Sequence, residues 1–358
     1  MSSSRRIFLI VLSAVTLGLL LAVCIRAAGS KPLGRQGPAI DQFPYHSARF
    51  THFLRESDLY CKPSEPRDFY VWMDQAYANC NHRFPGKEQM SLEELLKTKR
   101  EQFGRISNPF VKAENEIAFS AWVHRMVKTV IPRFSIGRGF EYCNVIRYGE
   151  RQCFLQSTLV TGLLQSVGFR AGVVMVYKNR SGQESNNGHA VVLLKLADGR
   201  DIIVDASDPE PFFRPQGIFV KNPEYRYVSP VYAPNSSRIR YYMTTSGLRA
   251  LATTEVGPLD YGFVRSQFWY YRGEQAKGAL LSSRPTSEGL AEARKALEQS
   301  VKYCGKNPLA VYMLGRVYYA QGKTEQARQA FENAYDLYLR FGWIPSEPKR
   351  YYEITAGL

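Results

Sequence analysis

The strongest constraint on the fold is a change of hydrophobic period in the middle of the chain. Residues 153–167 form an apolar run of helical length, and Gly168 stands where a helix C-terminal cap is expected. The next residues are apolar and β-branched, and polar turns divide them into short segments. This pattern predicts strands over residues 171–177, 189–196 and 201–205.

The last two of these strands are joined by Asp198-Gly199, a dipeptide typical of tight hairpins. Strands joined by a hairpin are antiparallel, and the predicted helices come before the strands rather than alternating with them. This order predicts the α+β class, with helices packed on an antiparallel sheet.

The flanking regions have weaker patterns. Residues 50–104 have amphipathic helical spacing, and Ser91-Leu-Glu-Glu94 is a capping box at the start of one helix. A further helix is predicted over residues 114–130, followed by a Gly-rich loop over residues 137–149. Residues 206–270 have little period and predict strands or covering loops, after which helices resume.

Cys153 stands in the first turn of the predicted apolar helix. The free N–H groups and the positive end of the helix dipole favour a thiolate there, and the thiolate is the nucleophile of cysteine chemistry. The same N–H groups can stabilise an oxyanion during acyl transfer. His189 begins one predicted strand and Asp205 ends its hairpin partner, so the carboxylate can orient the imidazole. We therefore predict a catalytic triad of Cys153, His189 and Asp205.

The alternation of side chains along strands adds a geometric condition. His189 shares a face with Leu193, so Asp205 has to lie opposite an odd-numbered residue. A two-residue turn would set Asp205 opposite Val192, on the wrong face. A three-residue loop over residues 198–200 sets Asp205 opposite Leu193. The triad therefore predicts such a loop, or a β-bulge.

Several segments of this region follow one another in a fixed order: a Trp-bearing helix at 117–123, Gly149-Glu-Arg-Gln-Cys153, the Leu-rich helix at 159–164, Gly168-Phe-Arg170, Gly188-His-Ala190 and Ile202-Ile-Val-Asp205-Ala. In this order they resemble the transglutaminase-like superfamily, over roughly residues 110–210. Two positions depart from its pattern, and they leave substrate preference open. Val191 stands where an aromatic residue is common, and Gln152 rather than glycine directly precedes the cysteine.

The resemblance implies a papain-like reaction, in which a thioester forms at Cys153 and an amine leaves. Water would complete amide or peptide hydrolysis, and an amine acceptor would complete a transfer. Many proteins of this kind resemble peptidases or amidases, which favours hydrolysis. Two other functions stay open: an arylamine N-acetyltransferase-like acyl transferase, although its Arg-Gly-Gly-x-Cys stretch is absent, and a catalytically inactive binding scaffold in the cell envelope.

A second pattern lies near the C-terminus, at Leu314, Gly315, Tyr318, Gly322, Ala327, Phe331 and Ala334. This spacing resembles a tetratricopeptide repeat, in which small residues let two antiparallel helices approach closely. A weaker copy ends before Pro308. Because a helical hairpin cannot bury its apolar face alone, we expect it to pack on the catalytic domain or on its neighbours. It would serve either as a protein-binding groove or as a stabilising cap.

The N-terminal sequence has the pattern of a signal peptide or a membrane anchor. Arg5-Arg6 precede an apolar run over residues 7–25, close to the length that crosses a bilayer and also compatible with a signal peptide. We expect a signal or membrane anchor at 1–27, a linker at 28–45, a catalytic domain at 46–270 with its core at 110–210, and a helical module at 271–358. The domain is expected outside the cytoplasm, in the cell envelope or periplasm, anchored or secreted.

The net charge of +15 favours acidic partners, but no nucleic-acid motif accompanies the basic residues. No cofactor or metal is predicted, because Cys61, Cys80 and His82 lack a fourth ligand with sensible spacing. Cys61 and Cys80 can pair in an oxidising compartment or stay free. The predicted partners are a protein or peptide substrate, a membrane at the N-terminal segment, and a protein bound by the helical repeats.

Overall fold

The computed structural model describes residues 38–65 and 67–357, and the described residues form one compact unit. The predicted N-terminal anchor lies outside them. Among the described helices, none combines the length and the apolar character needed to cross a bilayer.

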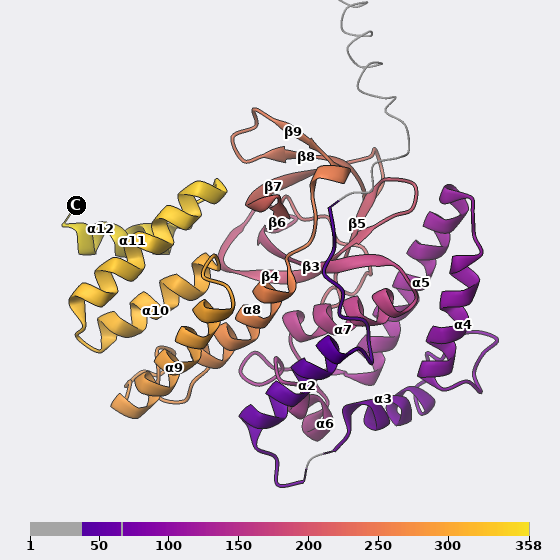
Figure 1. The fold of residues 1–358 in the computed structure, drawn as a ribbon, viewed down its shortest axis with the longest axis horizontal. Helices are drawn as coiled ribbons and strands as arrows, with labels where there is room; N and C mark the ends of the chain where they lie inside the picture. Colours follow the sequence, from indigo (N-terminus) through magenta and orange to yellow (C-terminus); the bar gives the residue numbers. More distant parts are fainter. Residues whose placement is uncertain (1–37, 66, 358) are drawn as a thin grey trace, which may run out of the picture. The chain divides into compact units, whose positions relative to one another are not determined.

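The centre of the fold is an antiparallel sheet with the strand order β5-β4-β3-β6-β7-β8-β9 (Figure 1). Strand β5 also pairs with β8, which closes the sheet into a barrel. The strands are β3 (Arg170–Lys178), β4 (Glu184–Lys195), β5 (Asp201–Val204), β6 (Gly217–Asn222), β7 (Glu224–Tyr232), β8 (Arg238–Thr244) and β9 (Ala250–Ala252). A separate parallel pair joins β1 (Arg133–Phe134) to β2 (Glu150–Arg151). The predicted α+β class is confirmed.

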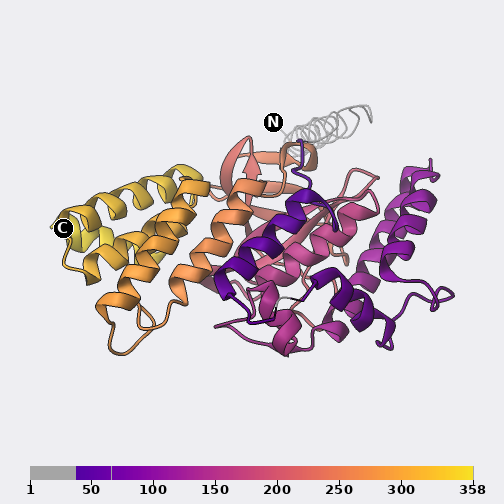
Figure 2. The same ribbon diagram turned by 60° about the horizontal axis from the view of Figure 1, so that its bottom comes forward.

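In the described part of the chain, helices cover the sheet in two groups (Figures 1 and 2). The first group precedes or interrupts the early strands: α2 (Ala48–Cys61), α3 (Phe69–Ala78), α4 (Leu92–Gly104), α5 (Pro109–Val130), α6 (Tyr142–Tyr148) and α7 (Cys153–Ser166). The second group follows the sheet: a short 3-10 turn (Thr253–Glu255), then α8 (Tyr261–Glu274), α9 (Ser287–Tyr303), α10 (Pro308–Ala320), α11 (Thr324–Phe341) and α12 (Ser346–Ala356). The boundary predicted at residue 270 falls inside α8.

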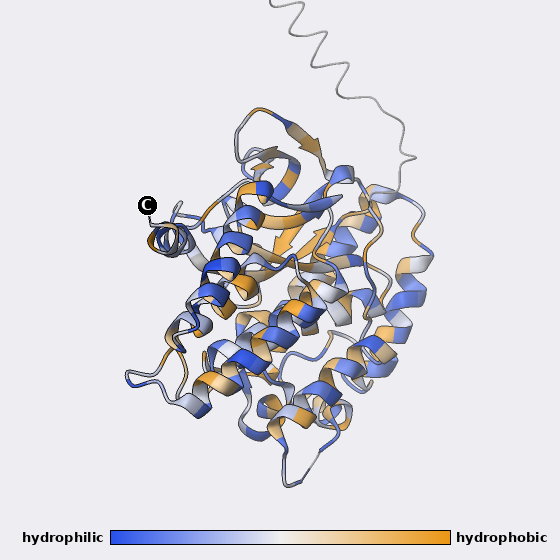
Figure 3. Ribbon diagram, turned by 60° about the vertical axis from the view of Figure 1, so that its left-hand side comes forward, coloured by the Kyte–Doolittle hydropathy of each residue, from blue (hydrophilic) through white to orange (hydrophobic). Residues whose placement is uncertain are grey.

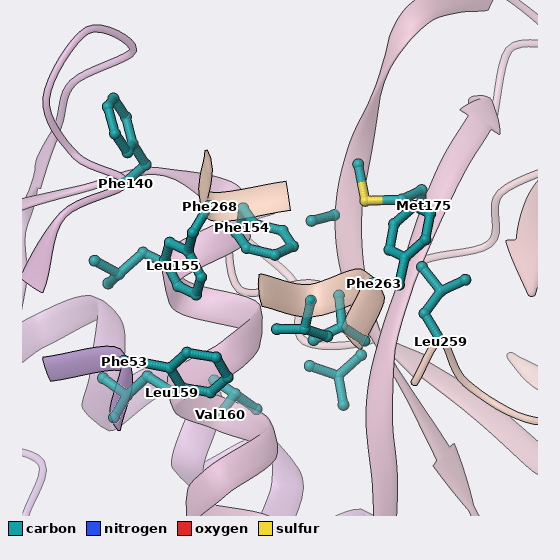
Figure 4. Close-up of a cluster of buried hydrophobic side chains, with 14 of the residues drawn as sticks. Phe53, Phe140, Phe154, Leu155, Leu159, Val160, Met175, Leu259, Phe263 and Phe268 are labelled. Carbon is teal, nitrogen blue, oxygen red and sulfur yellow. The ribbon is translucent and has the colours of Figure 1, made fainter. Parts of the chain in front are cut away.

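The alternating side chains of the sheet build two cores. Met175 of β3 faces the helices and joins the larger core, whereas Val174 faces the barrel interior. Figure 3 shows the apolar strands in the centre and the polar faces of the helices turned outward. In the larger core, the Phe154 ring of α7 packs 4.8 Å from the Phe268 ring of α8, centroid to centroid, with Leu155 nearby (Figure 4).

Helix α7 begins at Cys153, as predicted, and its residues from Phe154 to Gln165 are all buried. A helix that is largely apolar and has no distinct polar face belongs in the interior, which explains its central place. Its C-terminal cap is also as predicted. Gly168 adopts a left-handed φ of 86°, its N–H donates to Gln165, and the next N–H donates to Leu164.

Helix boundaries differ from the predictions at three places. Helix α5 begins at Pro109 rather than 114, because the Asn108 side chain caps its first turn and proline suits the first helical position. Helix α6 forms inside the predicted Gly-rich loop. Helix α8 begins at Tyr261, where the Asp260 side chain accepts a hydrogen bond from the Phe263 N–H.

The C-terminal helices form two close hairpins that pack on the sheet. A Cβ added to Gly315 of α10 would lie 2.8 Å from the Phe331 ring of α11, so glycine is required for this approach. Phe341 at the end of α11 lies 5.6 Å from Phe219 of β6, centroid to centroid. The apolar face of the hairpin is thus buried against the barrel.

Candidate active site

Cys153 is a free, partly exposed thiol at the first position of α7. The preceding residue, Gln152, has an extended backbone, and its side chain makes no capping hydrogen bond. The N–H groups of the first turn are therefore not satisfied by a side-chain cap. A thiol at this position meets the positive end of the helix, as the sequence predicted.

His189 and Asp205 are brought together by the β4–β5 hairpin. His189 Nε2 donates to Asp205 Oδ2 at 2.7 Å. The remaining carboxylate oxygen, Oδ1, accepts from the Ser207 N–H at 2.8 Å. Because both oxygens of this buried carboxylate are engaged, its orientation toward the imidazole is fixed.

The hairpin geometry meets the predicted condition with a different loop. Val192 pairs with Val204 and Lys195 with Asp201, so the same register sets Asp205 opposite Val191, on the face of His189. The backbone N–H of Leu196 donates to Arg200, which leaves a three-residue loop over residues 197–199. The loop length was predicted correctly, but its position was wrong by one residue.

The pKa of His189 reflects its surroundings. Burial alone would lower this pKa, but the hydrogen bonds to Asp205 and Cys153, together with their charges, outweigh burial and raise it to about 10. The imidazole is therefore charged at neutral pH and lies within hydrogen-bonding range of Cys153. Since Nε2 is taken by Asp205, the nitrogen left for Cys153 is Nδ1. An imidazolium next to a thiol favours the thiolate.

Gln156, one turn after Cys153, ties the nucleophile helix to the segment that follows Asp205. Its side chain is fully buried, its Nε2 donates to the Ala206 carbonyl at 3.2 Å, and its Oε1 accepts from Arg151 at 2.8 Å. Sequence reasoning missed this residue. The available signal was a long amide side chain one turn after the cysteine, in a helix that the sequence predicts to be buried.

The same segment is also held from α5. Lys128 Nζ donates to the Asp208 carbonyl at 2.6 Å, and the buried His124 ring bonds to the same oxygen at 3.0 Å. The loop that carries Asp205 is therefore fixed against two helices.

Tyr271 of α8 is a further neighbour of the thiol that the sequence did not indicate. Burial, reinforced by the nearby charges of Cys153 and Glu274, raises the pKa of this phenol far above its usual range. Tyr271 is therefore neutral, and its hydroxyl lies near the side chains of Gln267 and Gln152. The C-terminal helices thus contribute to the surroundings of Cys153.

The cysteine pairing differs from the one considered. Cys61 at the end of α2 forms a disulfide with Cys143 of α6, and Cys80 is a free buried thiol. The Cys61–Cys80 pairing is therefore wrong. Among the described residues, no group of three or more His, Cys, Asp or Glu side chains is arranged to hold a metal ion.

No protein-family model matches the chain, and no curated protein matches its sequence. Val191 and Gln152 are the two residues that depart from the transglutaminase-like pattern. Val191 is fully buried in the barrel core, and Gln152 is buried next to Tyr271.

Proposed function

We propose that this protein is a cysteine-nucleophile amide or peptide hydrolase of transglutaminase-like type. Cys153 is the nucleophile, His189 the general base, and Asp205 the group that orients the imidazole. The observation that carries the proposal is the position of His189, which bonds Asp205 at 2.7 Å and lies within hydrogen-bonding range of the Cys153 thiol. Nucleophile, base and orienting group within hydrogen-bond reach are the pattern of covalent acyl transfer.

The proposed reaction has two steps. Before the attack the Cys153 proton already lies on His189, as a thiolate–imidazolium pair. The Cys153 Sγ then attacks the amide carbonyl carbon, and the N–H groups at the start of α7 stabilise the oxyanion. His189 returns the proton to the departing amine, which leaves a thioester at Cys153. Water, deprotonated by His189, then releases a carboxylic acid and restores the thiol. An amine in place of water would make the same site an acyl transferase.

We also propose that the domain works outside the cytoplasm. The apolar run after Arg5-Arg6 supports this location. The Cys61–Cys143 disulfide supports it as well, because disulfides persist mainly in oxidising compartments.

Selective alkylation tests the proposed nucleophile. The full chain is treated with limiting iodoacetamide across a pH series, and mass spectrometry locates the label. Cys80 and Cys304, both free and buried, serve as internal references. We expect Cys153 to react fastest well below pH 8, and to lose this advantage in His189→Ala. Cys153→Ser is the matched control for label position.

If Cys153 reacts no faster than the reference thiols, or if His189→Ala leaves its rate unchanged, the hydrolase proposal is refuted. The inactive scaffold would then be the better explanation of this geometry. A positive result justifies a screen of peptide and amide substrates with the same variants.

A further inference from the structure

The contact with Asp205 does not by itself fix the orientation of the His189 ring. The bond from Nε2 to Asp205 Oδ2, at 2.7 Å, holds one atom of the ring and leaves the ring plane free to turn about this bond. The torsion angle that sets the plane of a histidine ring has broad minima, so the side chain does not fix the plane either. The His189 side chain is 31% exposed, which leaves room for such a turn. A second contact is needed to keep the other ring nitrogen toward Cys153.

Phe213 makes a second contact with the His189 ring. The centroids of the two rings lie 6.4 Å apart, and their planes stand at 89° to each other. Such an edge-to-face arrangement is a favoured geometry of aromatic rings, and it depends on the angle between their planes. Phe213 is partly buried and packs on the barrel core, so its own ring is held in place. It can therefore hold the imidazole plane as well.

The chain brings Phe213 to this place by folding back after Asp205. The Phe213 N–H donates to the Ile203 carbonyl at 3.3 Å, and Phe212 pairs with Val204 of β5. Successive side chains of an extended segment point to opposite faces. Accordingly, Phe212 packs on the larger core and Phe213 on the barrel core. One short segment thus supplies both the carboxylate and the aromatic ring that His189 contacts.

We propose that Phe213 is a positioning residue of the candidate site. Its ring holds the plane of the His189 imidazole, so that the nitrogen not bonded to Asp205 faces Cys153. Groups that take part in catalysis have to be held within about 10–20° of the productive orientation, which one hydrogen bond does not achieve. The inference rests on the proposed function and adds to it a residue that acts through His189.

Two measurements test this role, and one of them does not depend on the thiol. The first is the order parameter of the His189 ring, from ¹³C relaxation at Cε1, in the full chain carrying Cys153→Ser. The second is the rate at which iodoacetamide labels Cys153 at pH 6 in the chain with the native cysteine. Both compare Phe213→Ala with Phe212→Ala. This matched control removes the same ring at an adjacent, partly buried position that packs on the other core. Thermal unfolding checks that each variant is folded.

We expect Phe213→Ala to lower the order parameter toward about 0.6, the range of flexible groups. It should also slow the labelling of Cys153 about tenfold, because the imidazolium no longer faces the thiol and favours the thiolate less. Phe213→Leu keeps an apolar side chain and should slow labelling about threefold. It becomes the deciding variant if Phe213→Ala does not fold. Phe212→Ala should leave both readouts at their native values.

An order parameter that the Phe213 variants leave unchanged, or that Phe212→Ala lowers as much, would overturn the inference. If Cys153 is activated in the native chain, an unchanged labelling rate in the folded Phe213 variants would overturn it too. If native Cys153 shows no activation while the Phe213 variants alone free the ring, the hydrolase is refuted and the positioning role of Phe213 stands.

Discussion

Replacing Asp205 with asparagine keeps the shape of the side chain and removes its charge. In the native chain the pKa of His189 is raised to about 10, against the effect of burial, by Asp205 and Cys153. An opposite charge at this distance accounts for about 1–3 pH units of such a rise. We therefore expect the pKa of His189 in Asp205→Asn to fall to between about 7 and 9.

The same substitution has a pH-dependent effect on stability. The unfolded chain releases the His189 proton near pH 6.5, whereas the folded chain holds it to about pH 10. The stability that this pair contributes is therefore fully present below pH 6.5 and is lost as the pH rises toward 10. The His189 side chain is 31% exposed, so solvent screening reduces the effect. We expect Asp205→Asn to lose about 1–2 kcal/mol at pH 6 and little at pH 10.

Two measurements check these values. Histidine labelled with ¹³C at Cε1 gives five ring signals, and the one missing in His189→Gln belongs to His189. Its titration is followed in the native chain and in Asp205→Asn, and urea unfolding of both is compared at pH 6 and pH 10. A native pKa near 6.5, or the same pKa in both chains, would refute the electrostatic reasoning.

Two further substitutions test the supports of the site and of the C-terminal hairpin. Gln156→Leu leaves the Ala206 carbonyl without its donor and should cost about 1–3 kcal/mol in thermal unfolding. It should also move the pKa of His189 toward its ordinary value, and an unchanged titration would contradict a positioning role. Gly315→Ala places a Cβ 2.8 Å from the facing ring and should cost about 1–3 kcal/mol. The control Gly104→Ala meets nothing within 4 Å, and equal losses in both would show that crowding is not the cause.

Elements whose ends are set locally were predictable from the sequence. The Ser91–Glu94 capping box forms as expected. Helix α7 begins at the predicted residue and ends one residue before the predicted end. Helix α6 was missed because its support is distant. The disulfide to Cys61 holds Cys143, and the buried Arg272 of α8 donates to Glu141, 131 residues away, just before the helix. No local pattern in a Gly-rich segment indicates such contacts.

In the candidate site, too, some features were predictable from the sequence and others depend on distant contacts. The chain order of a cysteine at a helix start, a histidine in one strand and an aspartate at the end of the hairpin partner was enough to predict that Cys153, His189 and Asp205 lie together. The predicted start of the histidine strand was wrong, because β4 begins at Glu184 rather than at His189. The register of the β4–β5 hairpin could not be predicted, because it depends on the hydrogen bond from the Leu196 N–H to the Arg200 carbonyl that closes the loop. Tyr271 could not have been predicted, because its place beside Cys153 depends on how α8 packs on α7.

The burial of α7 links the candidate site to the whole fold. Its interior residues contact the sheet and helices on every side, so this helix cannot separate from the core while the rest stays folded. Backbone amides in such an element exchange with solvent only when the entire structure opens. The thiol at its tip therefore stays beside His189 as long as the protein is folded, and a damaged or partly translated chain would lack this neighbour.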